Sequence, residues 1–276
     1  MTDMKKNAED IFRKGSKTYF YSSIFFPEKI RTRVFTLYAF VRTADDFVDS
    51  VPQNAAGFYA FRDAYRKATE GIPSGNPVID DFVMLEGECG FRHEWTESFF
   101  NSMELDLSKK NYDAMNETLE YIYGSAEVIG LYMCSLMGLD PQSHKSAVML
   151  GRAMQMINFI RDIDEDNGLG RRYLPLTGCT LKSLTQAEAE NNRKEFDRFI
   201  RDQIKIYLEW QREAEAGYHY IPFRYRVPIQ TAAKMYKWTA SVICKHPTIV
   251  YRKKVKPSKL RIFATFTACF AFGWLK

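Results

Sequence analysis

Apolar residues recur at helical spacing along almost the whole chain, and this pattern constrains the fold more than any other feature of the sequence. No convincing stretch alternates with the period of two that marks a strand. Proline and glycine divide the pattern into segments of helical length. The sequence therefore predicts an all-α fold. The expected helices lie near residues 27–50, 54–70, 77–90, 93–109, 113–138, 142–166, 185–221, 228–245 and 258–273.

No internal repeat, low-complexity tract or long polar linker divides the 276 residues. A chain of this length can bury a sizeable core as one large domain. We therefore expect a single domain over residues 1–276, with a basic and apolar tail at about 250–276. Aromatic residues are abundant at 15%, which indicates either a large core or an apolar cavity, and we favour the core.

The positive charge is concentrated at the C-terminal end. None of the 34 acidic residues follows Glu215, whereas many of the 39 basic residues do. Such an end suits nucleic acid, anionic lipid or a polyanionic substrate. The uncharged stretch Ile262 to Leu275 comes next and is too short to span a bilayer, which needs about 20 residues. It either lies at a membrane interface or packs on the domain, and nucleic acid is not the expected partner.

The five cysteines are scattered and form no C-x-x-C pair. This pattern argues against a disulfide framework or a zinc site and favours a reducing compartment. Residues 1–13 contain no apolar run, so no secretory signal is expected. The predicted location is the cytoplasm, with the inner face of the membrane as the alternative.

The first polar constellation comprises Tyr38, Arg42, Asp45 and Asp49. Steps of four, three and four residues place these side chains on one face of a helix. Two carboxylates one turn apart repel each other unless a cation lies between them, and hard oxygen ligands suit Mg²⁺ completed by substrate phosphates. An arginine one turn earlier can bind those phosphates. A solvated helix face produces the same spacing, so this motif alone leaves both interpretations open.

The second constellation comprises Gln155, Asn158, Asp162 and Asp166, again at steps of one helical turn. It lies in a segment that otherwise looks buried, so the amides need partners. Either a structural network or a metal-bound diphosphate could supply them. The glycine-containing loop that follows carries Arg171, Arg172 and Tyr173.

The two constellations together are more specific than either alone. Carboxylate pairs on separate helices, each with an arginine, could face each other across a bundle and hold several Mg²⁺ ions and one or two diphosphates. The metals would draw charge from a leaving diphosphate. An apolar aromatic wall would shelter the resulting carbocation from water.

Several blocks carry a resemblance to a known family. They are Gly15 to Phe20, Leu37 to Arg42, Asp45 to Asp49, Met103 to Leu107 with Tyr112 and Asp113, Tyr121 to Gly130, Asn158 to Asp166, Arg171 to Pro175, and, more loosely, Tyr236 and Val250 to Val255. Over most of its length the chain resembles the squalene/phytoene synthase family. The resemblance implies a helical bundle with a central cavity, Mg²⁺ as cofactor with Mn²⁺ as the alternative, and prenyl diphosphate substrates.

The resemblance also implies a role for each matching residue. The implied metal ligands are Asp45, Asp49, Asn158, Asp162 and Asp166. The implied diphosphate ligands are Arg42, Arg161, Arg171 and Tyr173, with help from Gln155 and Asn158. Further substrate contacts are implied for Ser16, Tyr19, Ser23 and Tyr38, and closure of the site for Tyr236 and Arg252. The catalytic set is thus Tyr38, Arg42 and the four aspartates.

Two positions depart from the family pattern. Gly15 stands where many members have histidine, and Glu127 stands where many have a small hydroxyl residue. An acid at position 127 either faces the second motif or serves as a local helix partner, and we favour the latter.

The implied reaction joins two prenyl diphosphates head to head through a cyclopropylcarbinyl diphosphate. Proton loss then gives phytoene or dehydrosqualene, whereas hydride from NADPH gives squalene. The segment Arg172 to Pro175 resembles the phytoene type, and Ser23 would leave room for a C20 chain, so we expect phytoene synthesis from geranylgeranyl diphosphate without NADPH. The alternatives are a squalene or dehydrosqualene synthase that uses farnesyl diphosphate, and a non-catalytic, membrane-associated helical assembly factor.

Overall fold

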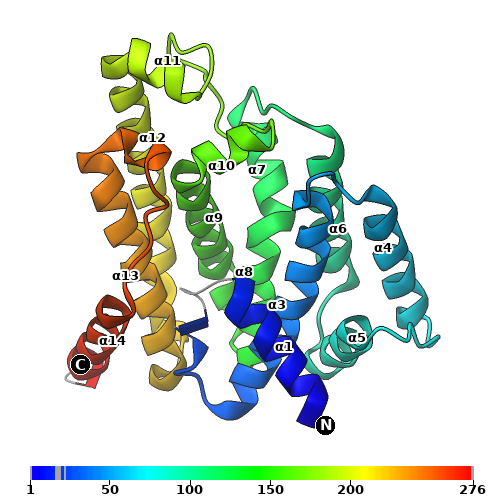
Figure 1. Cartoon of the computed structure of the whole chain (residues 1–276). Helices are drawn as coiled ribbons and strands as arrows, with labels where there is room; N and C mark the ends of the chain where they lie inside the picture. The colour runs from blue at the N-terminus through cyan, green and yellow to red at the C-terminus, as the bar shows by residue number, and fades with distance from the viewer. Residues whose placement is uncertain (1, 16–19, 22, 275–276) are drawn as a thin grey trace.

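The structure is a computed structural model of the chain and describes residues 2–15, 20–21 and 23–274. The described residues form helices joined by loops, the longest of them over residues 169–185, without a strand beyond one isolated bridge between Asn111 and Arg172 (Figure 1). The α-helices are α1 (Thr2–Gly15), α3 (Glu28–Asp49), α4 (Ala55–Thr69), α5 (Pro77–Cys89), α6 (His93–Ser108), α7 (Met115–Ile122), α8 (Val128–Met137), α9 (His144–Arg161), α10 (Ile163–Gly168), α11 (Gln186–Asn191), α12 (Arg193–Glu215), α13 (Phe223–Lys245) and α14 (Lys259–Trp274). Single turns of other helix types are η1 (Tyr123–Glu127), η2 (Pro141–Ser143), η3 (Ala216–Tyr220) and η4 (Pro247–Tyr251).

The predicted all-α fold is confirmed, but several elements differ from expectation. The helix expected over 185–221 divides into α11, α12 and η3, and the π-helical turn η1 interrupts the helix expected over 113–138. Helix α1 was not expected. The helix expected over 142–166 breaks at Asp162, and the helix expected from residue 228 begins five residues earlier, at Phe223. Pro228 lies inside that helix because the carbonyl of Pro222 already accepts hydrogen bonds from the amides of Tyr225 and Arg226. Pro228 therefore removes one backbone hydrogen bond near the start of α13 but does not mark where the helix begins.

Phenylalanine side chains hold α3 at the centre of one core cluster. Phe40 of α3 is fully buried and stacks on Phe82 of α5 with ring centroids 3.7 Å apart. Phe61 of α4 and Phe100 of α6 pack around the same ring. Such aromatic pairs stabilise a core beyond the area they bury. The aromatic surplus of the sequence thus largely serves the core, as expected, and fixes the helix that carries the first acidic motif.

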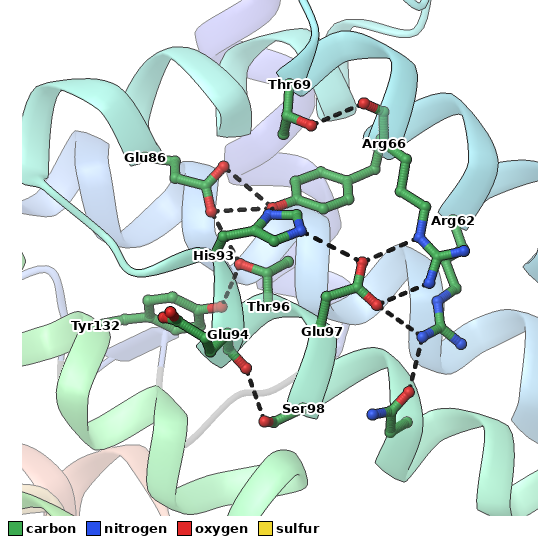
Figure 2. Close-up of polar contacts among 12 residues, drawn as sticks. Arg62, Arg66, Thr69, Glu86, His93, Glu94, Thr96, Glu97, Ser98 and Tyr132 are labelled. Carbon is green, nitrogen blue, oxygen red and sulfur yellow. Dashed lines mark hydrogen bonds and ion pairs between the residues drawn. The ribbon is translucent and has the colours of Figure 1, made fainter.

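Polar contacts fasten α4 to α6 on the outer side of this cluster (Figure 2). Arg62 donates hydrogen bonds to Glu97 at 2.7 Å and Glu104 at 3.0 Å, and Arg66 donates two to Glu97. Bidentate arginine–carboxylate contacts of this kind fix geometry as well as adding energy. They therefore hold α6 in place, and α6 extends from here toward the acidic motifs.

Glycines allow α9 to lie unusually close to the helix that runs from α7 through η1 into α8. A Cβ atom on Gly151 would lie 2.3 Å from the carbonyl oxygen of Ala126, and one on Gly130 would lie 2.3 Å from that of Ala147. Both obstacles are backbone atoms, which cannot move without shifting a helix. The π-helical turn η1 contributes Ala126 to this contact, and such turns inside α-helices are frequent at functional sites.

This close contact generates a stability prediction. Gly151→Ala should lower the free energy of unfolding by about 1–3 kcal/mol, because overpacking forces two helices apart. Gly87→Ala is the matched control, since Gly87 lies in α5 and a Cβ atom on it would meet no described neighbour within 4 Å. The control should raise stability by about 0.5–1 kcal/mol through helix propensity alone. Urea unfolding monitored by circular dichroism measures both; equal stability of the two variants would contradict the close contact.

Candidate active site

The first acidic motif lies along one face of α3, as its spacing predicts. Arg42 bonds Asp45 at 2.8 Å and Asp46 at 2.5 Å, so the motif carries its own cation. The ring of Tyr38 stacks on Phe12 of α1 with centroids 3.8 Å apart. A Cβ atom on Gly15 would lie 2.4 Å from the Tyr38 hydroxyl. Tyr38 therefore occupies space that a larger residue at position 15 would enter.

The second motif keeps its common face although its helix breaks. Asp162 leaves the helical conformation between α9 and α10. Even so, the Asp162 amide donates to the Asn158 carbonyl at 2.8 Å, and the Asp166 amide donates to the Asp162 carbonyl at 2.9 Å. Arg161 bonds the Asp162 carboxylate through two nitrogen atoms. The Oδ1 atom of Asn158 is buried and has no hydrogen-bond donor in the part of the chain that the structure describes.

Arg171 joins the two motifs. Its Nη1 atom donates to Asp49 Oδ1 at 2.7 Å, its Nη2 atom donates to the Val48 carbonyl at 2.6 Å, and its backbone amide donates to the Asp166 carbonyl at 2.8 Å. The side chain is almost fully buried, with 3% of its surface exposed. The structure thus brings together the acids of two distant segments and places Arg171 between them.

A buried carboxylate that sequence reasoning missed lies behind Arg171. Asp106 of α6 is 1% exposed and accepts hydrogen bonds from Tyr173 at 2.5 Å and Tyr121 at 2.7 Å. Its Oδ1 atom lies 3.9 Å from Arg171 Nη1. Burial raises the pKa of Asp106 to about 6, and the charge of Arg171 opposes that rise. The block Met103 to Leu107, which contains Asp106 and resembles the family pattern, was the available signal.

Tyr173 was expected at the diphosphate, and the described contacts of its hydroxyl are with Asp106 and Arg171. Its ring is buried and stacks on Phe159 of α9 with centroids 4.5 Å apart. The loop after α10 is further fixed because Arg172 exchanges backbone hydrogen bonds with the loop between α6 and α7. These contacts hold Arg171 at the junction of the two motifs.

A lysine from the basic C-terminal segment also reaches the second motif. Lys254 Nζ lies 3.2 Å from Asp162 Oδ1 and forms an ion pair with Glu165. Arg252, the residue expected to close the site, is exposed and pairs with no carboxylate among the described residues. Sequence reasoning missed Lys254 because it stands in a run of similar cations. Tyr236 is buried on α13, close enough to Tyr38 to affect its titration.

An apolar cavity of about 320 Å³ opens from this polar region. Ser146, Leu150, Met154 and Asn158 line it from α9 at steps of four residues, which spans about 18 Å at 1.5 Å per residue. Tyr38, Ser125, Gln155 and Asn158 give it one polar end. The aromatic wall expected from the sequence is not what the described lining shows, because most of it is aliphatic, methionine or glycine. Ser23 lies on this lining, as expected.

The remaining expected residues fall into two groups. Ser16 and Tyr19 lie outside the described residues. Glu127 is buried and accepts a hydrogen bond from Arg152 of α9 at 2.6 Å. We had favoured a partner on its own helix, whereas the described partner lies on another helix.

The acids of the site repel one another, which makes it receptive to cations. Burial and the charge of Asp49 raise the pKa of Asp45, and burial and the charges of Asp162 and Asp106 raise that of Asp166. No three carboxylate, histidine or cysteine side chains of the described residues converge on one metal position. The donor set fits Mg²⁺, which usually takes one or two carboxylates together with substrate phosphates and water, and the unpaired Asn158 oxygen is a further hard donor.

Comparison with known proteins identifies the family and the fold of the chain. A sequence model of the family described as squalene/phytoene synthase matches residues 12–261. The chain belongs to the squalene/phytoene synthase family. Members of this family are prenyltransferases. The match spans both acidic motifs, Asp106 and Lys254.

Relatives within the squalene/phytoene synthase family include bacterial phytoene synthases. The chain is 25% identical over 275 residues to the 15-cis-phytoene synthase of Synechococcus elongatus, with 92% of this chain and 88% of that protein covered. It is 29% identical over 236 residues to the 15-cis-phytoene synthase of Enterobacter agglomerans, with 81% and 80% covered.

Solved structures of similar fold include a dehydrosqualene synthase and a squalene synthase. The former superposes with a TM-score of 0.81 at 20% identity and covers 100% of this chain and 98% of its own. The latter, HpnC from Alicyclobacillus acidocaldarius, has a TM-score of 0.78 at 21% identity, with 90% and 95% covered. None of the helices in the described ranges is both long and apolar enough to cross a bilayer.

The position of Asp106 generates a prediction about metal use. Asp106→Asn should raise the Mg²⁺ concentration needed for half-maximal activity about 10–100-fold. The reason is that Arg171 loses the negative charge of Asp106, pairs more strongly with Asp49, and so competes with the metal for that carboxylate. Activity measured over a Mg²⁺ series tests this. Asp113→Asn is the matched control, since Asp113 pairs with Arg172 at the surface with 81% of its side chain exposed. An unchanged Mg²⁺ response in Asp106→Asn would assign Asp106 to folding alone.

Proposed function

We propose that the chain joins two geranylgeranyl diphosphate molecules head to head, through cyclopropylcarbinyl diphosphate, to give phytoene and release diphosphate. The observation that carries this proposal is the meeting of two acidic motifs, linked by Arg171, at the polar end of an apolar cavity. The phytoene synthases among the relatives support the choice of product. The acidic motifs come from distant parts of the chain, which supports its action as one domain.

The charged end of the cavity would bind the diphosphates and their metal ions. We assign Mg²⁺, with Mn²⁺ as the alternative, to Asp45, Asp49, Asn158, Asp162 and Asp166. When bound, the metal supplies positive charge that stabilises the departing diphosphate. We assign the diphosphate oxygens to Arg42, Arg161, Arg171, Tyr173, Gln155, Ser16, Tyr19 and Tyr38. Tyr236, Arg252 and, in addition, Lys254 would close this end, and Lys254 could exchange its carboxylate partners for phosphate oxygens.

The apolar cavity would bind the prenyl tails and exclude water from the cation. Water exclusion favours proton loss over hydroxylation. Ser23 is 4% exposed on the lining, and its small side chain leaves space for a long tail. A C15 substrate, with squalene or dehydrosqualene as product, is the second candidate, favoured by the similar fold of enzymes with those names. We propose that NADPH is not required, and that the chain acts in the cytoplasm in peripheral contact with a membrane.

Product analysis tests the proposed function. The purified chain is incubated with geranylgeranyl diphosphate or farnesyl diphosphate and Mg²⁺, with and without NADPH, and the extracted products are identified by mass. Phytoene from the C20 substrate without NADPH is the expected result. Squalene that depends on NADPH would replace this proposal with the second candidate. If neither substrate gave a condensation product, with or without NADPH, the result would point to the non-catalytic alternative.

Substitution of the paired acids tests the metal assignment. Asp45→Ala, Asp49→Ala, Asp162→Ala and Asp166→Ala should each lower turnover about 100-fold or more, because the site loses stabilisation of developing charge. Asp164→Ala is the control, since Asp164 is exposed between the two acids of the second motif. Steady-state kinetics and circular dichroism distinguish lost chemistry from lost fold. Near-normal turnover in two of the four variants would refute the assignment.

The cavity lining generates a prediction about chain length. Ser23→Phe should shift the ratio of C15 to C20 turnover upward by about tenfold or more, because a phenylalanine ring would fill part of the tail pocket. Competition between the two diphosphates in one reaction measures this ratio. Ser23→Ala should leave the ratio unchanged, since it adds no bulk to the pocket and, among the described residues, the Ser23 hydroxyl donates to the Phe20 carbonyl. An unchanged ratio in a folded Ser23→Phe variant would remove position 23 from the pocket.

A further inference from the structure

Helix α14 presents one apolar face to the domain and another to solvent. Ile262 and Cys269 are buried, whereas Leu260, Phe263 and Phe270 are 78%, 58% and 50% exposed. The helix lies against the outside of α13 at the edge of the bundle (Figure 1). It therefore combines both arrangements that the sequence left open, since it packs on the domain and still exposes large apolar side chains. Exposed clusters of this kind mark interaction sites.

The surroundings of this exposed face are positively charged. Lys259 and Arg261 of α14 lie over the rings of Tyr21 and Trp238, each 4.7 Å from the ring centroid. Neither cation pairs with a carboxylate among the described residues, and neither α13 nor α14 contains an acidic residue. Aromatic rings hold these cations in place without neutralising their charge. The charge of the surface is thus complementary to an anionic one.

The same helix lies next to the prenyl cavity. Phe266 of α14 stacks on Phe25 with ring centroids 3.6 Å apart. Phe25 stands between Ser23 and Phe26, and both of these line the cavity. Phe270 packs on Phe223 at the start of α13, a helix whose next turns also line the cavity. Two aromatic pairs therefore connect α14 to the segments that line the cavity, residues 23–26 and the first turns of α13.

We propose that the exposed face of α14, with Lys259 and Arg261, docks on an anionic lipid bilayer, and that prenyl tails pass between lipid and cavity beside the Phe25–Phe266 pair. Docking in the plane of the interface suits a helix with one apolar face and basic flanks. The passage of tails rests on the proposed function, because only a prenyl substrate or product needs it. A long hydrocarbon that moves from lipid directly into an apolar cavity avoids exposure to water.

Vesicle sedimentation of the full chain tests the docking surface. The parent protein should bind vesicles of phosphatidylcholine with phosphatidylglycerol more tightly than vesicles of phosphatidylcholine alone, and less tightly as salt increases. The Leu260→Asp/Phe263→Asp variant should bind the anionic vesicles about tenfold more weakly or worse. Met84→Asp is the matched control, because Met84 is 65% exposed on α5, away from α14. Parent-like binding by the double variant would overturn the proposal.

A second copy of the chain is the competing occupant, and sedimentation velocity distinguishes it. A parent dimer that the double variant dissociates, without vesicle binding by either protein, would overturn lipid docking.

Turnover with two substrate sources tests the passage of tails. With substrate supplied in vesicles, Leu260→Asp/Phe263→Asp should lose about tenfold or more of its activity, whereas with substrate in detergent micelles it should match the parent. Equal losses in both would overturn the route. Phytoene synthesis without vesicle binding would leave the proposed reaction standing and refute the docking. Vesicle binding without any condensation would support the docking and refute the proposed reaction.

Discussion

The contact between Arg171 and Asp49 is the interaction on which the arrangement of the site depends. It joins residues 122 positions apart and fixes the end of α3 against the loop after α10. A nearly buried guanidinium is stable only when charged and polar partners surround it. Val48, Asp106 and Tyr173 complete those partners. The positions of α3, α6 and this loop are therefore mutually dependent.

The acids of the two motifs concentrate negative charge in one part of the site, and this excess accounts for the cations that surround them. Burial and the charge of Asp49 raise the pKa of Asp45, and burial and the charge of Asp162 raise that of Asp166. Arg42, Arg161, Arg171 and Lys254 compensate only part of the negative charge. A diphosphate accompanied by divalent cations would complete that compensation. The apolar cavity begins where the charged groups end, so binding of the charged head and shelter of the hydrocarbon tail are assigned to adjacent but distinct surfaces.

The basic end of the chain divides into two parts that face different partners. Lys254 turns inward and pairs with Asp162 and Glu165. Lys259 and Arg261, only a few residues later, lie over aromatic rings at the outside of the bundle. The change occurs where the irregular segment after η4 gives way to α14. One run of cations thus supplies both a carboxylate partner at the second acidic motif and a positively charged outer surface.

The sequence by itself determined the helices and the two acidic motifs, because helical periodicity and one-turn spacing depend on residues close together in the chain. It also indicated Ser23 on the cavity and both alternatives for the C-terminal stretch. Only the tertiary structure decided that Asp106 lies behind Arg171, that Lys254 and not Arg252 meets the second motif, and that the helix breaks at Asp162. Asp106 stands two residues from another acid, Glu104, and Lys254 follows Arg252 and Lys253, so the local sequence does not show which residue of each group meets the site. Their partners are chosen by the packing of helices far apart in sequence, which no spacing rule encodes.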